Sequence, residues 1–321
     1  MHIQQIENKK FIICFKQLSK QHLHNNNKWK KIAIDKAIKS IASSYVIIIS
    51  GAQAKKLITN IGNGIARRID EIIKSGTLKE LKELKIKETK EYTALKEFSR
   101  ITGVGPSRAT KWIKQKIYTI DALKNAIDNN KITITHHIKI GLKYLDDFEK
   151  RIPRLKIELF EILLKKVIES FNDKKIMVEI CGSYRRGLET SGDVDILLSH
   201  QTDKNYLKKL VTRLTNIGCI TDNLTALGDK KYMGVYNIDK ISRRIDIRFI
   251  KRKSYYTAML YFTGSRDFNI KIRKCALKKG YSLSEYQLKN VETGEDIFLN
   301  SEKELFTILG ETYVKPTDRV P

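Results

Sequence analysis

The chain has 321 residues, enough for two to four small domains. Its 62 Lys and Arg residues exceed its 36 Asp and Glu residues, and the net charge of +26 indicates a polyanionic partner. The longest apolar runs, such as Val46–Ile49, are too short to cross a bilayer, so nucleic acid is favoured over a membrane. Four widely spaced cysteines predict reduced thiols in an intracellular protein, not disulfides or zinc ligands.

The first motif in chain order is Ile58–Glu71. Gly62 and Gly64, followed by apolar residues at helical spacing, predict a helix-hairpin-helix whose backbone amides approach a DNA phosphate without contacting bases. Asn60 stands where a first glycine is usual, and asparagine tolerates left-handed backbone angles. Taken alone the motif is weak, because many such glycine turns are only helix caps.

A second hairpin is predicted at Phe98–Lys111. Gly103 and Gly105 form its turn, and Pro106 suits the first turn of the next helix. Exposed amides at that helix start would bind a backbone phosphate. We interpret the pair His136–His137 as packing or surface residues, because adjacent side chains point apart on a helix or a strand.

The stretch with the most chemistry is Gly182–Asp195. It follows a predicted strand and begins with a Gly-Ser turn and two arginines, which together could cradle a phosphate. Asp193 and Asp195 would project from one face of the next strand, and two adjacent carboxylates repel each other unless a cation lies between them. Oxygen ligands beside a phosphate cradle favour Mg²⁺, so the pattern predicts a nucleotidyl-transfer site.

This stretch resembles the signature of family X DNA polymerases, and its beta-type members in particular. The similarity covers nearly the whole chain, most strongly from about residue 99 onward. It implies an α+β fold in which a mixed β-sheet nucleotidyltransferase domain is joined to helical helix-hairpin-helix DNA-binding domains. It also implies four domains: a 5′-phosphate-binding, lyase-like domain at 1–89, a DNA-binding domain at 90–150, a palm-type catalytic domain at 151–261 and a nucleotide-selecting domain at 262–321.

A third carboxylate is expected in Arg243–Phe249, where charged and apolar residues alternate as in a half-buried strand. Alone, this run would be interpreted as a surface strand. If it lies beside Asp193–Leu198, Asp246 completes the set of carboxylates needed for two Mg²⁺ ions. Asp246 would then also accept the proton of the primer 3′-hydroxyl.

The resemblance assigns further residues to the incoming dNTP. Backbone at Gly264 beside Tyr261 and Phe262 would leave no space for a 2′-hydroxyl. Arg266 departs from the family pattern, which has an acidic residue there, and its guanidinium could stack on the nascent base. The dNTP-binding residues implied are Arg151, Ser183, Arg186, Gly192, Tyr261, Phe262, Gly264 and Asn269.

For DNA, the resemblance implies contacts from both hairpins and from the catalytic domain. A monovalent cation, K⁺ or Na⁺, would bind the backbone carbonyls of Ser99, Ile101 and Val104 and bridge to the primer phosphate. The DNA-binding residues implied are Lys30, Gly62, Gly64, Arg68, Gly103, Gly105, Arg244 and Arg273.

The N-terminal domain of beta-type enzymes also excises deoxyribose phosphate, using a lysine that forms a Schiff base. Here Arg68 occupies the matching position, and a guanidinium cannot serve as that nucleophile. Ile34 replaces a tyrosine and Glu80 a further lysine. Excision is therefore doubtful, although a neighbouring lysine such as Lys55, Lys56 or Lys74 could substitute.

These features predict a template-directed polymerase that fills short gaps in DNA repair. The alternatives are a template-independent terminal nucleotidyltransferase, for which Tyr236–Arg243 leaves little room for an inserted loop, and a non-catalytic gap-binding scaffold. Expected partners are gapped or primed DNA, dNTPs, and a DNA ligase or other repair proteins, with no membrane, for a protein acting as a monomer. The expected location is the nucleus, or the cytoplasm if the source is a cytoplasmic DNA virus.

Overall fold

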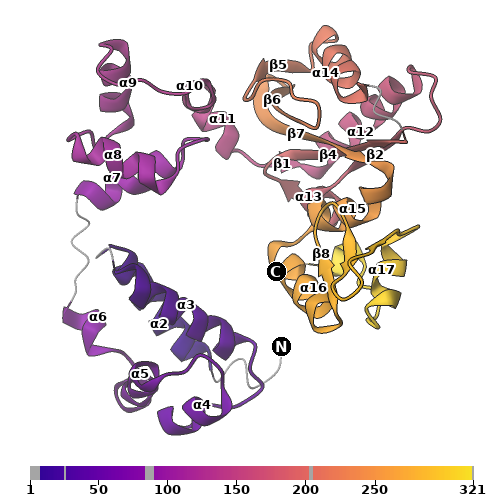
Figure 1. Cartoon of the computed structure of the whole chain (residues 1–321). Helices are drawn as coiled ribbons and strands as arrows, with labels where there is room; N and C mark the ends of the chain where they lie inside the picture. The colour runs from indigo at the N-terminus through magenta and orange to yellow at the C-terminus, as the bar shows by residue number, and fades with distance from the viewer. Residues whose placement is uncertain (1–7, 25–26, 84–89, 202–204, 320–321) are drawn as a thin grey trace. The chain divides into compact units, whose positions relative to one another are not determined.

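The computed structural model describes residues 8–24, 27–83, 90–201 and 205–319. The chain forms two compact units, one built from residues up to 96 with 110–119, and the other from 97–109 with 120 onward (Figure 1). None of the described helices combines the length and the apolar character needed to cross a bilayer. All four cysteines are free thiols.

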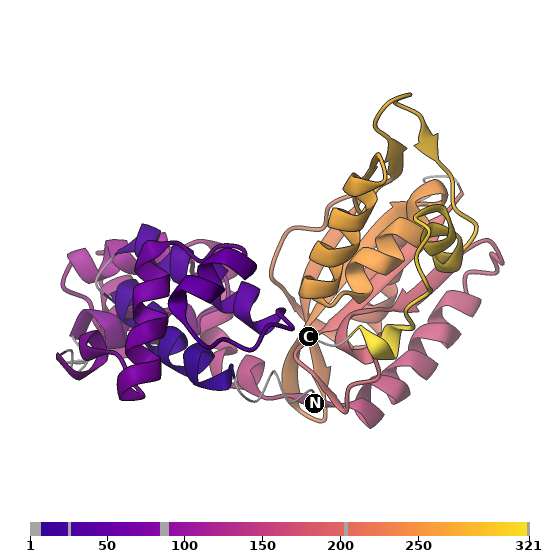
Figure 2. The same ribbon diagram turned by 90° about the horizontal axis from the view of Figure 1, so that it is seen from below.

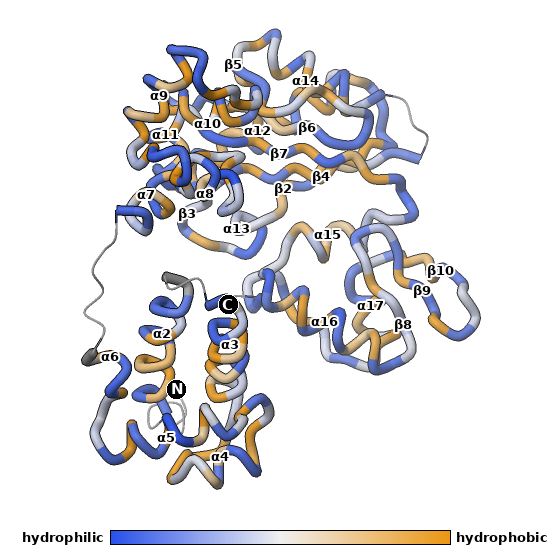
Figure 3. Tube along the Cα trace, turned by 60° about the vertical axis from the view of Figure 1, so that its left-hand side comes forward, coloured by the Kyte–Doolittle hydropathy of each residue, from blue (hydrophilic) through white to orange (hydrophobic). Residues whose placement is uncertain are grey.

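The first unit is helical. Its core is formed by apolar residues at helical spacing, and α2 and α3 lie side by side (Figure 3). In α5, Ile65, Ile69 and Ile72 are all buried, as their spacing predicts. Its helices are α2 (Lys9–His24), α3 (Lys28–Ala42), α4 (Gly51–Leu57), α5 (Asn63–Ser75) and α6 (Lys79–Glu83).

Short helices follow up to residue 149. Two of them, α7 (Lys90–Ser99) and α8 (Pro106–Lys114), flank the predicted second hairpin turn and contribute residues to both units. The remaining three belong to the second unit: α9 (Ile120–Asp128), α10 (His136–Lys143) and α11 (Leu145–Glu149).

A mixed sheet of five strands is the centre of the second unit, in the order β2-β4-β7-β6-β5. Strands β4 and β7 are parallel, and the other neighbours are antiparallel. The predicted α+β fold with a mixed sheet is therefore confirmed. The strands are β2 (Met177–Ile180), β4 (Val194–His200), β5 (Ile220–Asn223), β6 (Lys231–Ile238) and β7 (Ile241–Lys251).

Helices pack on both faces of this sheet, which Figure 2 shows after a quarter turn. Apolar residues of α12 (Arg154–Glu169) and α14 (Tyr206–Asn216) join Val194, Ile196 and Leu198 in one core. On the other face, Leu197 packs with residues of α15 (Tyr255–Thr263). Smaller elements complete this part: β1 (Ile152–Pro153), α13 (Gly182–Arg185), β3 (Thr190–Ser191) and the 3₁₀ turn η1 (Arg252–Ser254).

The C-terminal segment forms its own small core, centred on Leu288, Leu305 and Phe306. It consists of α16 (Arg266–Lys278), the three-stranded sheet β8 (Tyr281–Leu283), β9 (Leu288–Asn290) and β10 (Asp296–Ile297), then α17 (Glu302–Ile308) and the 3₁₀ turn η2 (Pro316–Asp318). Ser265 caps α16 by accepting a hydrogen bond from the Phe268 amide.

Candidate active site

The parallel pairing of β4 and β7 brings two of the predicted carboxylates together. Asp195 and Asp246 are direct partners across these strands, and Asp193 immediately precedes β4. On both strands the residues between the charged positions are buried in the core shared with α12 and α14. The alternation of the two strands therefore turns the carboxylates toward the opposite face of the sheet.

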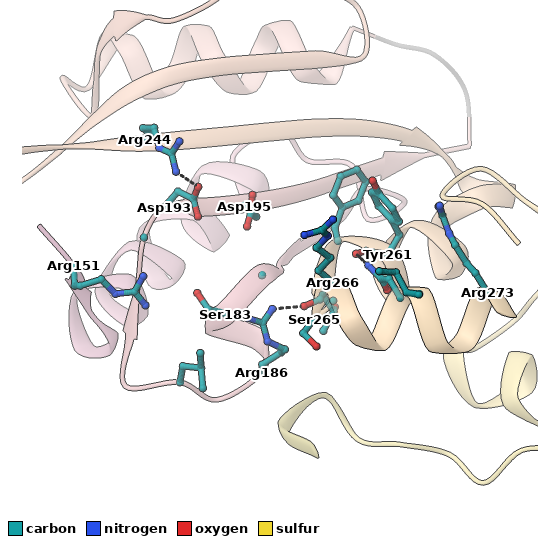
Figure 4. A pocket seen from close by; sticks show the side chains of 18 residues that line it. Arg151, Ser183, Arg186, Asp193, Asp195, Arg244, Tyr261, Ser265, Arg266 and Arg273 are labelled. Atoms are coloured by element: carbon teal, nitrogen blue, oxygen red, sulfur yellow. Dashed lines mark hydrogen bonds and ion pairs between the residues drawn. The ribbon is translucent and has the colours of Figure 1, made fainter. Parts of the chain in front are cut away.

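A cavity of about 840 Å³ opens in front of these strands (Figure 4). Its walls come from β4, α13, α15 and α16, so segments far apart in the sequence meet here. It is lined by predicted site residues and by Arg266. The predicted residues are Arg151, Ser183, Arg186, Gly192, Asp193, Asp195, Arg244, Tyr261, Phe262, Gly264, Asn269 and Arg273.

The paired carboxylates are buried, which disfavours their charged forms. Burial raises the pKa of Asp195 to about 7, and the negative charges of Asp193 and Asp246 add to the effect. Burial, followed by the charge of Asp193, also raises the pKa of Asp246. Asp246 Oδ1 is buried and has no hydrogen-bond partner among the described residues. This acceptor and the excess negative charge fit a divalent cation.

Asp193 is engaged differently. Its Oδ2 accepts a hydrogen bond from Arg244 Nη2 at 2.5 Å, and Figure 4 shows this pair above the cavity. Within the part of the chain that the structure describes, no three His, Cys, Asp or Glu side chains converge closely enough to hold a metal ion. Asp193 is therefore paired with Arg244 and not grouped with Asp195 and Asp246 in this structure.

The predicted phosphate cradle lies beside Asp195. Its Gly-Ser segment forms the single helical turn α13, and Gly182 has a φ of 58°. A Cβ on Gly182 would lie 2.3 Å from Asp195 Oδ2, so only glycine allows this close approach. Ser183 Oγ donates to Ser191 Oγ at 2.8 Å.

Of the two arginines expected in the cradle, Arg186 lines the cavity and Arg185 does not, and Arg151 lines it from the segment before α12. Arg186 Nη1 donates to the Thr263 carbonyl at 2.6 Å, while its buried Nε has no partner among the described residues. Arg151 Nη2 donates to the Thr190 carbonyl at 2.7 Å. A Cβ on Gly192 would lie 3.2 Å from Arg151 Nη1, so Gly192 lets this guanidinium lie close to the backbone.

The opposite wall is formed by the end of α15 and the start of α16. Tyr261 and Phe262 pack edge to face, with ring centroids 5.1 Å apart. Asn269 Nδ2 donates to the Tyr261 carbonyl at 2.7 Å, leaving its buried Oδ1 without a partner in the described ranges. Arg273 lies over the Tyr261 ring at 4.9 Å and contacts Glu285. Gly264 has a φ of 64°, which favours glycine at this turn.

Arg266 is the first residue of α16 and is exposed. In Figure 4 its side chain extends into the cavity from the start of that helix. No hydrogen bond, ion pair or ring contact engages its guanidinium within the described residues, whereas Arg151, Arg186, Arg244 and Arg273 each have a protein partner. Its charge is therefore available to a ligand.

Sequence reasoning missed an ion-pair network that ties the cradle to the C-terminal segment. Arg185 Nη2 donates to Glu302 Oε2 at 2.6 Å, and Arg319 Nη1 donates to Glu302 Oε1 at 2.8 Å. Arg185 Nη1 also donates to Thr263 Oγ1 at 2.8 Å. No sequence signal singles out Glu302, because an acidic residue in the first turn of a helix is common.

The residues of the first predicted hairpin lie in the first unit. Asn60 has a φ of 62°, which confirms the left-handed conformation expected for it. Gly62 caps α5, and a Cβ there would meet nothing within 4 Å. Lys30 is exposed on α3. Arg68 donates to both carboxylate oxygens of Glu80, at 3.0 Å and 3.1 Å.

The turn of the second predicted hairpin lies in the second unit, which holds residues 97–109, whereas Thr110 and Lys111 belong to the first. Gly103 has a φ of 89°, and a Cβ there would lie 3.0 Å from the His137 ring. A Cβ on Gly105 would meet nothing within 4 Å, and the Ile101 carbonyl accepts the Val104 amide. His136 Nε2 lies 2.7 Å from the Asn223 carbonyl oxygen, and burial lowers the pKa of His137. His136 is therefore an exposed surface residue, and His137 packs beside Gly103, as the sequence interpretation allowed.

Comparison with known proteins gives a consistent assignment along the chain. Residues 6–78 match the family model described as a helix-hairpin-helix domain, and residues 96–149 match the fingers domain of DNA polymerase lambda. Residues 151–252 match the DNA polymerase beta palm, and residues 258–320 match the DNA polymerase beta thumb.

Similar proteins cover most of this chain. It is 30% identical to DNA polymerase lambda of Rattus norvegicus over 94% of this chain and 54% of that protein. It is 32% identical to DNA polymerase lambda of Arabidopsis thaliana over 84% of this chain and 54% of that protein. It is 25% identical to DNA nucleotidylexotransferase of Xenopus laevis over 97% of this chain and 68% of that protein. The chain spans about half the length of the two lambda polymerases. With palm, thumb, fingers and helix-hairpin-helix matches in succession, the chain belongs to family X of the DNA polymerases.

Proposed function

We propose that this chain is a template-directed DNA polymerase that fills short gaps during DNA repair. It adds a dNTP to a primer 3′-hydroxyl and releases pyrophosphate. The observation that carries the proposal is the pairing of Asp195 with Asp246 across parallel strands, beside a cavity lined by five arginines. Carboxylates that attract cations, next to guanidinium groups that attract phosphates, are what nucleotidyl transfer requires.

Two Mg²⁺ ions would be held by Asp193, Asp195 and Asp246, where they would stabilise negative charge on the attacking and leaving oxygens. Asp193 takes part after releasing Arg244, which is then free to contact the primer phosphate. Asp246, which carries the unpartnered buried oxygen, would accept the proton of the 3′-hydroxyl. A raised carboxylate pKa suits this transfer, because the group then takes up a proton more readily than an ordinary aspartate does.

The cradle residues would bind the triphosphate. Ser183 of α13 and Arg186, which follows that helix, line the cavity with Arg151 and Gly192. On the other wall, Tyr261, Phe262 and Gly264 would exclude a 2′-hydroxyl and so select deoxynucleotides. Asn269 would contact the base edge, and Arg273 the template strand.

DNA would be held by the two hairpins in addition to the catalytic domain. Lys30, Gly62, Gly64 and Arg68 would contact the downstream 5′-phosphate, and Gly103 and Gly105 the primer backbone. A K⁺ or Na⁺ ion would bind the carbonyls of Ser99, Ile101 and Val104. We divide the chain for these roles at residues 89, 150 and 261. The protein would act as a monomer alongside a DNA ligase or other repair proteins, in the nucleus or, for a cytoplasmic virus, in the cytoplasm.

The main alternative is a template-independent terminal transferase, and one similar protein bears the name DNA nucleotidylexotransferase. The connection between β6 and β7 favours templated synthesis. Ile238 pairs with Ile241, and the two residues between them, Asp239 and Lys240, have φ values of 51° and 63°. This tight hairpin turn leaves no inserted loop to take the place of a template.

A primer-extension assay on gapped DNA tests the proposal. With a templating base in a single-nucleotide gap, we expect addition of the complementary dNTP only. A 5′-phosphate on the downstream strand should increase the rate, and the increase should fall with salt. Equal addition of all four dNTPs to a blunt or single-stranded primer would identify a terminal transferase, and no addition on any substrate would identify a scaffold.

A further inference from the structure

A second cavity, of about 460 Å³, lies on the outer surface of α14. We call it the α14 groove and define it by Phe171, Lys208, Lys209 and Arg213, with Asn205 and Asn216. It is distant from the catalytic cavity along the sheet. Tyr206 packs on Phe171 and on His200, and His200 lies five residues from Asp195 on β4, which is about 16 Å of strand.

The groove carries positive charge that no described acidic side chain neutralises, and Lys209 lies over the Tyr206 ring at 4.9 Å. Lys208, Lys209 and Arg213 are exposed, and none of them forms an ion pair within the described residues. Lys209 and Arg213 are four residues apart on one helix, a spacing at which like charges destabilise the helix.

Asp173, the acidic residue that Tyr206 of α14 contacts, is engaged within the protein. Asp173 Oδ2 accepts a hydrogen bond from the Tyr206 hydroxyl and lies 3.2 Å from His200 Nε2. The Tyr206 hydroxyl, followed by the Lys175 amide, holds the pKa of Asp173 at about 2. Asp173 therefore holds Tyr206, on which Phe171 packs, and none of the described acidic side chains forms an ion pair with the three cations.

The spacing of the cations and the ring beside them indicate which kind of anion the groove would bind. From Lys209 to Arg213 the helix rises about 6 Å, which is comparable with the distance between neighbouring phosphates of an extended strand. Phe171 is only half-buried, so its ring can stack on a base, and the asparagines can donate hydrogen bonds. A line of cations beside an aromatic ring is typical of single-strand binding. An acidic peptide would use the cations but not the ring.

We propose that the α14 groove binds single-stranded nucleic acid at a site separate from the catalytic cavity. Helix α14 has 11 residues and is about 16 Å long, so the groove covers about two or three nucleotides. So small a site is weak alone. It becomes effective when the strand is already attached to the same protein molecule, because the effective concentration is then high. This inference does not depend on polymerase activity.

The test is a binding titration with the full chain. The protein is first saturated with unlabelled single-nucleotide-gapped DNA, and a labelled short oligothymidylate is then added and followed by fluorescence anisotropy. The triple variant Lys208→Gln/Lys209→Gln/Arg213→Gln should lose most of this second binding. The matched control changes three exposed thumb lysines, Lys278→Gln/Lys279→Gln/Lys303→Gln, and should bind within about twofold of wild type, because rim charges outside a site contribute little.

Salt dependence and a variant that removes the stacking ring distinguish a defined single-strand site from non-specific electrostatic attraction of DNA to the basic protein. Loss of three phosphate contacts should flatten the slope of log K against log salt by about 2, so between about 50 mM and about 200 mM salt wild type loses about 20-fold more affinity than the triple variant. Phe171→Leu keeps an apolar side chain and should weaken binding about fivefold or more at an unchanged slope. Unfolding in urea at the same midpoint as wild type would show that the variants are folded.

Three results would overturn the inference. The first is absence of oligothymidylate binding to the gap-saturated wild type. The second is an equal loss of oligothymidylate binding in the triple variant and in the thumb control. The third is displacement of the oligonucleotide by polyglutamate at concentrations at which unlabelled oligothymidylate is ineffective, which would identify the groove as a site for an acidic peptide.

Discussion

Replacing Asp246 by asparagine should abolish nucleotide addition and, in the absence of metal, stabilise the fold. Asp195 and Asp246 are neighbours on parallel strands, so their carboxylates lie within roughly 5 Å of each other if both side chains leave the same face. At an effective dielectric constant of about 20, two such charges repel by about 3 kcal/mol. The positive charges of Lys231, Arg244 and Arg248 offset part of this, and we expect about 1–2 kcal/mol to remain.

The effect should depend on pH in a defined direction. The pKa values of Asp195 and Asp246 are raised in the folded protein, so the protonated pair favours folding. This contribution is complete below the unfolded pKa of about 4 and is lost as pH rises through about 7. In EDTA, wild type should therefore lose stability between about pH 5 and about pH 8 relative to Asp246→Asn.

Urea unfolding at these two pH values, with and without Mg²⁺, measures the effect, and primer extension measures the activity. Mg²⁺ should stabilise wild type more than the variant, because the ion binds the folded carboxylates. Extension should fall at least about a hundredfold, while binding of gapped DNA is retained. Asp229→Asn, which removes an exposed carboxylate, is the control and should change neither property. A variant less stable than wild type at the higher pH, or one that keeps a tenth of the activity, would contradict the carboxylate assignment.

Two further predictions concern positions that depart from the family pattern. Arg266→Ala should raise KM about fivefold or more for all four dNTPs with little change in kcat, because a stacked guanidinium binds any base and its loss removes about 1 kcal/mol or more; a change confined to one dNTP, or to kcat, would refute the stacking role. Borohydride trapping on an incised abasic site should give no adduct with wild type or with Arg68→Lys, and an adduct mapped to Lys55, Lys56 or Lys74 would show that another lysine supplies the amine.

The sequence predicted well those features that depend on local pattern. Alternation in Arg243–Phe249 indicated a strand with Asp246 facing away from the core, and the spacing of Ile65, Ile69 and Ile72 indicated the buried face of α5. Asn60 took the left-handed conformation expected of it. In each case the evidence lies within a few residues, so a single stretch of chain is enough to decide it.

Features that depend on distant contacts were not predictable. Arg185 and Glu302 are 117 residues apart and meet only because α17 packs on α15. Nor did the sequence indicate that Asp193 would turn to Arg244. The α14 groove requires Phe171 beside residues of α14, which only packing on Tyr206 brings together. Such contacts result from tertiary packing, and no periodic pattern in the sequence indicates them.

The departures in the N-terminal unit depend on one another, and this explains why one substitution should not restore excision. Arg68 donates through Nε and Nη2 to the two Glu80 oxygens, and through Nη1 to the Gly64 carbonyl at 3.1 Å. Ile34 is 2% exposed in the apolar core of the first unit, where a tyrosine hydroxyl would be buried among apolar side chains. A lysine at position 68 would meet the Glu80 carboxylate, which favours the protonated amine, whereas Schiff-base formation needs the neutral one. Restoring a nucleophile therefore requires removal of the Glu80 charge and a polar group near Ile34, in addition to the lysine itself.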